Sequence, residues 1–181
     1  KASKLLTKKG KPYIMARVQD LNSSTTINIF DWQNGKSFEM KDNMVTLLIG
    51  KKGTGKTKKL ISLANEAVAA STGNVVVIEK GSKLTYDVTH KARLIDTEQY
   101  LISGYDMLFG FISGICAGNY DVTDILVDST FKICPEALAG LETFTKKLQD
   151  LAETASTNIV LLISADESEI PESINAVCRK V

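Results

Sequence analysis

The sequence contains little of the residue types that build disulfide frameworks and metal centres. Among its 181 residues are three cysteines, one histidine and three prolines. Cys116, Cys134 and Cys178 stand at unrelated spacings, which argues against a disulfide framework or a zinc motif and indicates reduced thiols. His90 has no cysteine or second histidine near it in the sequence. We therefore expect a cytoplasmic location and no metal centre built from histidine and cysteine.

Long apolar runs and a strong net charge are also missing. The composition is 44% hydrophobic, 24% charged and 7% aromatic, which is typical of a globular protein. No apolar run approaches the roughly 18–20 residues of a membrane helix, so we expect no membrane span. The net charge of +1 conceals an asymmetry, because residues 1–43 carry a net charge of +4 and the rest of the chain is acidic.

The hydrophobic pattern changes near Met44, and this change predicts two parts. In residues 1–43, short runs interrupted by turn signals predict three antiparallel strands, at 13–21, 25–32 and 36–40. Asn34-Gly35 is a strong hairpin signal between the last two strands. We interpret residues 1–43 as a short antiparallel β-meander. An alternative is that they form a segment separate from the domain of residues 44–181.

From residue 44 onward, short apolar runs alternate with segments of helical periodicity. Strands are predicted at 45–49, 74–78, 92–95, 124–127 and 159–163, and helices at 56–70, 104–117, 135–156 and 171–179. Continuous apolar runs are typical of parallel strands that are buried on both faces. The alternation therefore predicts an α/β fold with three layers, in which helices cover both faces of a parallel sheet.

Residues 50–57 read GKKGTGKT and match the phosphate-binding pattern G-x-x-x-x-G-K-[ST] at every fixed position. The motif needs a strand before it and a helix after it, and both are predicted here. Glycines let the loop turn its N–H groups toward phosphate oxygens, and the helix adds the positive end of its dipole. The residues expected to bind the phosphates of ATP are Gly50, Lys51, Lys52, Gly53, Thr54, Gly55, Lys56, Thr57 and Lys58.

Two further roles follow from the chemistry of such loops. Lys56 is expected to reach the β- and γ-phosphates, and the hydroxyl of Thr57 is expected to hold Mg²⁺. The apolar run at 125–127 ends in Asp128, at the edge of the sheet where ligands bind in open α/β folds. Asp128 is therefore predicted to hold the same Mg²⁺ through a water. The extra lysines around the loop are either solvated charge or additional attraction for an anion.

Residues 44–170 resemble a compact RecA-like P-loop ATPase. The resemblance is carried by the loop, by NVVVIE at 74–79, by TDILVDS at 123–129 and by NIVLLIS at 158–164. The sequence is also similar to small bacterial proteins described as PilT-like ATPases. The resemblance implies that Glu79 is the candidate catalytic base, because position 129 is serine and no glutamate follows Asp128; the alternative is a solvated charge at the end of the strand. It also implies that Ser164 occupies the position of the polar sensor residue.

The sequence departs from an efficient ATPase in its basic residues. It has three arginines, Arg17, Arg93 and Arg179, and none is an obvious arginine finger, which can contribute ~10³–10⁵ in rate. We therefore predict slow, Mg²⁺-dependent hydrolysis of ATP to ADP and phosphate by Lys56 and Asp128 with Glu79, or acceleration by a basic finger from another subunit. The guanine-reading pattern N/T-K-x-D is absent, which favours ATP.

The N-terminal meander resembles the first three strands of an OB-fold. Its aromatic residues and lysines predict stacking on single-stranded nucleic acid within residues 8–38, unless the aromatic residues form the meander's own core. The alternative function is a nucleotide-gated module that binds single-stranded nucleic acid, with incidental turnover. A third is a P-loop domain that binds no nucleotide. The acidic residues at 166–172 are either a solvated helix start or, less simply, a metal site.

Overall fold

The computed structural model describes residues 2–6, 12–16, 27–31, 36–40, 45–175 and 178–180. The chain divides into two compact units, Lys1–Asp42 and Asn43–Val181. No helix in the described part of the chain is both long enough and apolar enough to cross a membrane.

The first unit contains four short strands that pair in sequence order. They are β1 (Ala2–Leu6), β2 (Pro12–Ala16), β3 (Ile27–Asp31) and β4 (Lys36–Met40). Each neighbouring pair is antiparallel. Strand β1 was not among the predicted strands, and the predicted strand 13–21 is described only as far as Ala16. Of the predicted nucleic-acid segment, residues 8–11, 17–26 and 32–35 lie outside the described residues.

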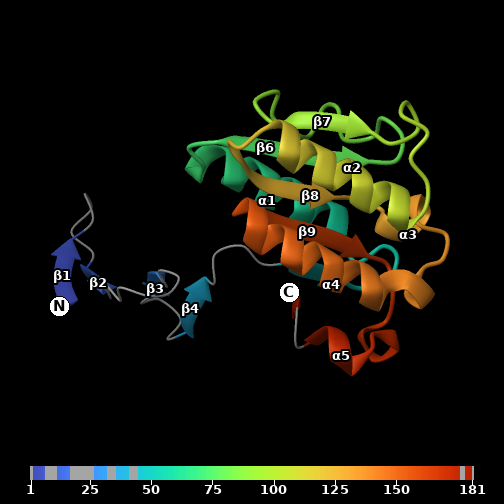
Figure 1. Cartoon of the computed structure of the whole chain (residues 1–181). Coiled ribbons are helices and arrows are strands. Elements are labelled where there is room, and N and C mark those ends of the chain that lie inside the picture. Colours follow the sequence, from blue (N-terminus) through green and yellow to red (C-terminus); the bar gives the residue numbers. More distant parts are fainter. Residues whose placement is uncertain are drawn as a thin grey trace. The chain divides into compact units, whose positions relative to one another are not determined.

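The second unit contains a six-stranded sheet with helices on both faces (Figure 1). Its strands are β5 (Val45–Ile49), β6 (Asn74–Glu79), β7 (Arg93–Asp96), β8 (Val122–Val127), β9 (Asn158–Ile163) and β10 (Cys178–Lys180). All pairs are parallel, in the order β10-β5-β9-β8-β6-β7. The helices are α1 (Lys56–Ala70), α2 (Tyr105–Gly118), α3 (Thr130–Ile133), α4 (Leu138–Ala155) and α5 (Glu172–Asn175), with a 3₁₀ turn at Glu167–Glu169. This arrangement confirms the predicted α/β parallel-sheet fold of P-loop NTPases.

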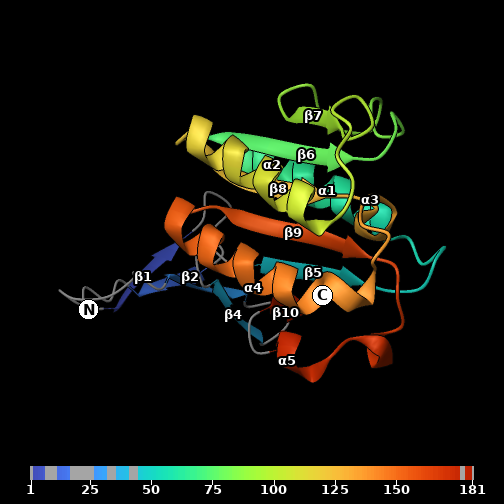
Figure 2. The same cartoon turned by 45° about the vertical axis from the view of Figure 1, so that its right-hand side comes forward.

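The continuous apolar strands are explained by burial on both faces of the sheet. Val76 and Ile78 of β6 pack in the cluster that includes α2 and α4, whereas Val75 and Val77 pack with α1. Figures 1 and 2 show α2 and α4 side by side on one face and α1 on the other. Side chains alternate between faces along a strand, so a strand covered on both sides needs apolar residues at every position.

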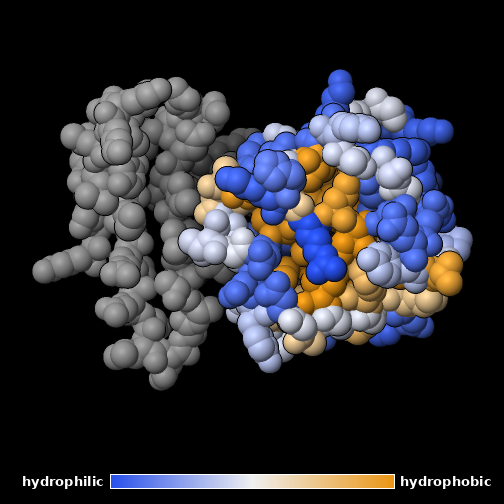
Figure 3. Space-filling view, turned by 90° about the horizontal axis from the view of Figure 1, so that it is seen from above, coloured by the Kyte–Doolittle hydropathy of each residue, from blue (hydrophilic) through white to orange (hydrophobic). Residues whose placement is uncertain are grey.

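The outer strand β7 pairs only with β6 among the described strands. Viewed from above, the surface of the second unit shows an apolar area bounded by hydrophilic residues (Figure 3). In the segment that follows β7, the side chain of Leu101 is large, hydrophobic and 82% exposed.

Two predicted helix boundaries are wrong. The helix predicted at 171–179 ends at Asn175, and Cys178–Lys180 form β10, which pairs with β5. The edge of β5 offers backbone hydrogen bonds that a local helical pattern does not reveal. The helix predicted to open at Pro135 begins at Leu138, after Ala137 adopts a φ of 47°. A residue with a positive φ cannot continue a right-handed helix, so Pro135 lies in the preceding turn.

Candidate phosphate-binding site

Parallel strands bring the predicted site residues to one edge of the sheet. Ile49 at the end of β5 pairs with Ile163 of β9, and Val127 of β8 pairs with both Leu161 of β9 and Ile78 of β6. The residues that follow these strands therefore lie at the same edge, which is where ligands bind in open α/β sheets. Strand β9 separates the strand before the glycine-rich loop from the strand that carries Asp128.

The loop between β5 and α1 has the backbone conformation that its glycines predict. Gly53 and Gly55 have φ values of 88° and 86°, which a side chain would strain. A Cβ at Gly50 would lie 2.9 Å from the hydroxyl of Thr54, so that position is restricted by space. Helix α1 has no acidic residue in its first turn and no side-chain cap. Its positive end therefore adjoins a loop with four lysines nearby, which favours an anion.

Lys56 lies inside the loop, where it binds the loop's own carbonyl. Its Nζ donates to the Lys51 carbonyl at 2.6 Å and lies 3.5 Å from the Thr54 hydroxyl. The Thr54 hydroxyl donates to the same carbonyl at 2.8 Å. Burial lowers the pKa of Lys56, and the negative charge of Asp128 opposes this effect. The ammonium is thus held by the backbone and the Thr54 hydroxyl of its own loop.

Thr57 and Asp128, predicted to share an ion, come together although they lie in different elements. The Thr57 hydroxyl donates to Asp128 Oδ1 at 3.4 Å, and the hydroxyl of Ser129 donates to Asp128 Oδ2 at 2.7 Å. Asp128 is only 7% exposed. A hydroxyl and a carboxylate are the hard oxygen ligands that Mg²⁺ prefers, so the residues fit this ion. Within the described ranges no group of three or more His, Cys, Asp and Glu could hold a metal by itself.

Glu79 is buried beside this site, but its carboxylate is bound by its own loop. It is 1% exposed, and its Oε2 accepts the Lys83 N–H at 2.9 Å and the Leu84 N–H at 3.1 Å. Burial raises the pKa of Glu79, those two N–H groups lower it, and the charges of Asp128 and Asp96 raise it further. Two N–H donors thus bind the carboxylate that was predicted to be a base, and that role stays a prediction.

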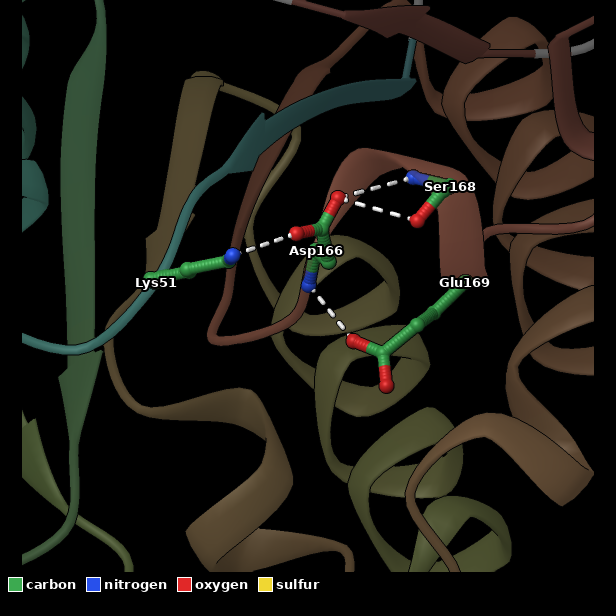
Figure 4. Close-up of polar contacts among 4 residues, drawn as sticks. All are labelled: Lys51, Asp166, Ser168 and Glu169. Carbon is green, nitrogen blue, oxygen red and sulfur yellow. Dashed lines mark hydrogen bonds and ion pairs between the residues drawn. The ribbon is translucent and has the colours of Figure 1, made fainter.

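The turn that follows β9 adds residues that sequence reasoning left as a solvated helix start. Asp166 Oδ2 pairs with Lys51 Nζ at 2.7 Å, and its Oδ1 accepts the Ser168 N–H at 3.2 Å (Figure 4). The Asp166 N–H donates to Glu169 Oε2 at 2.6 Å, which completes a capping box. An open hollow of about 470 Å³ lies between this turn and the loop. It is lined in part by Lys51, Lys52, Ser164, Asp166, Ser168 and Glu169.

The spacing of Asp166 and Glu169 was the available signal for this turn, because an acceptor followed three residues later by Glu is a capping box. The pairing with Lys51 was not readable, because it joins segments far apart in the chain. Lys52 and Lys58 are exposed, and Lys52 faces the same hollow as Lys51.

Similarity to known proteins was found among solved structures. No family model and no curated protein matches the sequence. Domain III of the replication initiation protein DnaA from Thermotoga maritima is 16% identical, with 78% of this chain and 55% of that chain covered and a TM-score of 0.42. The ATPγS-bound monomer form of the pCW3 conjugation coupling protein TcpA is 11% identical, with 84% and 53% covered and a TM-score of 0.45. This chain spans about half the length of these structures, and its fold class rests on its own strand order and loop.

Proposed function

We propose that the second unit binds ATP through residues 50–57 and hydrolyses it slowly with Mg²⁺. The observation that carries this proposal is the position of Asp128, 3.4 Å from the Thr57 hydroxyl at the start of α1. A loop that matched the glycine and lysine pattern by chance would have no reason to bring the buried carboxylate of Asp128 to the hydroxyl of Thr57. The spacing supports a site for phosphate oxygens and a divalent ion together.

Each residue has a role in this proposal. Lys56 leaves the Lys51 carbonyl and binds phosphate oxygens, while the N–H groups of the loop and of α1 bind the remaining oxygens. Thr57, and Asp128 through a water, would hold the ion, which would supply positive charge to neutralise the phosphates. Glu79 accepts a proton from the attacking water after its loop releases the carboxylate, and Ser164 contacts the γ-phosphate.

Slow turnover is expected from the positions of the basic residues in the second unit. Arg93 lies on β7, at the far side of the sheet from β5, and Lys80 donates to the Lys132 carbonyl at 2.8 Å. Of the arginines in the described part of the second unit, Arg93 is therefore far from the loop, and Arg179 lies on β10, opposite Thr46 near the start of β5. A basic residue from another subunit would supply the missing positive charge in the transition state.

Calorimetric titration with Mg²⁺-ATP, together with Lys56→Ala, tests the proposal. Loss of hydrogen bonds from a charged group, each contributing about 1.5–3 kcal/mol, predicts at least a tenfold rise in Kd. Lys59→Ala is the matched control, because Lys59 is an exposed lysine of the same helix. Equal Kd values for the wild-type protein and Lys56→Ala would contradict the proposal.

The base is tested separately with Glu79→Gln. Loss of a general base lowers the rate by about 10²–10⁴ and leaves the Kd for ATP unchanged. An unchanged rate would assign the hydrolytic step to another group.

The alternative function is nucleotide-gated binding of single-stranded nucleic acid by the first unit. The net charge of +4 on residues 1–43 favours it. A fluorescent oligonucleotide titrated at several salt concentrations, with and without Mg²⁺-ATP, tests this alternative. A slope of log affinity against log salt near zero would exclude phosphate contacts.

A further inference from the structure

The side chain of Lys51 is bound by the turn after β9, and its backbone carbonyl is bound by the loop itself. We propose that Asp166 is a positioning residue that weakens ATP binding, because it neutralises Lys51 and fixes the residue whose carbonyl binds Lys56. This inference rests on the proposed function, since it concerns the affinity of the same phosphate site.

The side chain of Lys51 is bound by a carboxylate that is itself fixed. The Lys51 ammonium lies 2.7 Å from Asp166 Oδ2. Ser168 donates to Asp166 Oδ1 through both its N–H, at 3.2 Å, and its hydroxyl, at 3.0 Å. The reciprocal bond from the Asp166 N–H to Glu169 closes the turn, as Figure 4 shows. The carboxylate is therefore presented to Lys51 in one orientation.

The backbone carbonyl of Lys51 binds two residues at the other end of the loop, Thr54 and Lys56. It accepts from Lys56 Nζ at 2.6 Å, from the Thr54 hydroxyl at 2.8 Å and from the Thr54 N–H at 3.3 Å. Phosphate oxygens would compete with this carbonyl for the N–H groups of the Lys56 ammonium. A constraint on Lys51 therefore acts on the residue that competes with phosphate for Lys56.

The charges point in the same direction as the contacts. The pKa of Asp166 is lowered to about 2 by the Lys51 hydrogen bond and by Ser168, and the pKa of Lys51 is raised chiefly by Asp166. Both groups thus stay ionised at neutral pH, and their opposite charges cancel at the mouth of the loop. A lysine released from this pair would add to the positive field that attracts an anion.

The test is the Kd for Mg²⁺-ATP at low salt, measured for Asp166→Asn, for Asp166→Glu and for Asp166→Asn in a Lys51→Met background. Exposed ion pairs are weak, so Asp166→Asn is expected to lower the Kd about two- to fivefold. Asp166→Glu keeps the charge and should stay within about twofold of the wild-type protein. Without Lys51, the effect of Asp166→Asn should fall by at least half. Glu142→Gln is the matched control, because it breaks an exposed pair of similar length with Lys146 on α4.

The outcomes separate this inference from the function on which it rests. If the wild-type protein binds no ATP, the proposed function fails. If it binds ATP and Asp166→Asn has an unchanged or higher Kd, Asp166 does not restrain the loop. An undiminished effect in the Lys51→Met background would show that Asp166 acts without Lys51, and it would also overturn the inference.

Discussion

The buried carboxylate of Glu79 gives the sharpest stability prediction, because its two backbone partners are known. In Glu79→Ala the Leu84 N–H loses its acceptor inside a buried segment, and an unsatisfied buried group costs about 1–3 kcal/mol. The Lys83 N–H is only partly buried, so water replaces part of its lost bond. Relief of the desolvated charge offsets some of the loss. We expect a net decrease of about 2 kcal/mol in the free energy of unfolding.

Glu79→Gln is the matched control for this prediction. With its amide oxygen in the place of Oε2, glutamine still accepts both the Lys83 and the Leu84 N–H. Its NH₂ group replaces Oε1, which accepts only the longer Leu84 N–H bond at 3.3 Å. The expected loss is therefore below about 1 kcal/mol.

Urea unfolding followed by circular dichroism at 222 nm measures both variants. Every described helix lies in the second unit, whereas the single tryptophan, Trp32, lies in the first. If Glu79→Ala is as stable as the wild-type protein, or if Glu79→Gln loses as much stability as Glu79→Ala, Glu79 does not anchor its loop.

The same side chain predicts a pH dependence. Burial raises the pKa of Glu79 above its value in the unfolded chain, so the unfolded chain ionises first as the pH rises. Ionisation of Glu79 therefore lowers stability from about pH 4 upward, and the cost is complete above the folded pKa. The stability of the wild-type protein relative to Glu79→Gln should fall across that range, and a flat difference between pH 4 and 8 would refute the assignment.

Three other substitutions and one labelling measurement test the packing of the second unit. Gly110→Ala places a Cβ in open space within α2 and should stabilise by about 0.5–1 kcal/mol in urea unfolding. Gly140→Ala would place a Cβ against the Tyr105 ring and should destabilise by about 1–3 kcal/mol. Tyr105→Phe removes the hydrogen bond to the Ala137 carbonyl at 2.5 Å and should cost about 1 kcal/mol in the same assay. Burial raises the pKa of Cys134 to about 12, so its thiol should react with a disulfide reagent only after unfolding, and rapid labelling of the folded chain would contradict its burial.

The sequence was sufficient for the elements whose local pattern and packing agree. Helix α1 was predicted at its observed bounds, because its apolar periodicity faces the sheet and the glycine-rich loop sets its start. The buried strands were predicted because a parallel strand covered on both faces has few positions for a polar side chain. The helix predicted after Pro171 was wrong at its end, because residues 178–180 form β10. The partner of β10 is the edge of a strand more than 100 residues earlier in the chain.

The candidate site divides in the same way. The sequence by itself determined the glycine-rich loop and the expectation that Thr57 and Asp128 lie together, because these depend on residue type at a fixed spacing after a strand. Only the tertiary structure decided that Glu79 is bound by two amides of its own loop and that Asp166 pairs with Lys51. Those contacts depend on which strand ends meet at the edge of the sheet, and strand order is set by the packing of the whole unit.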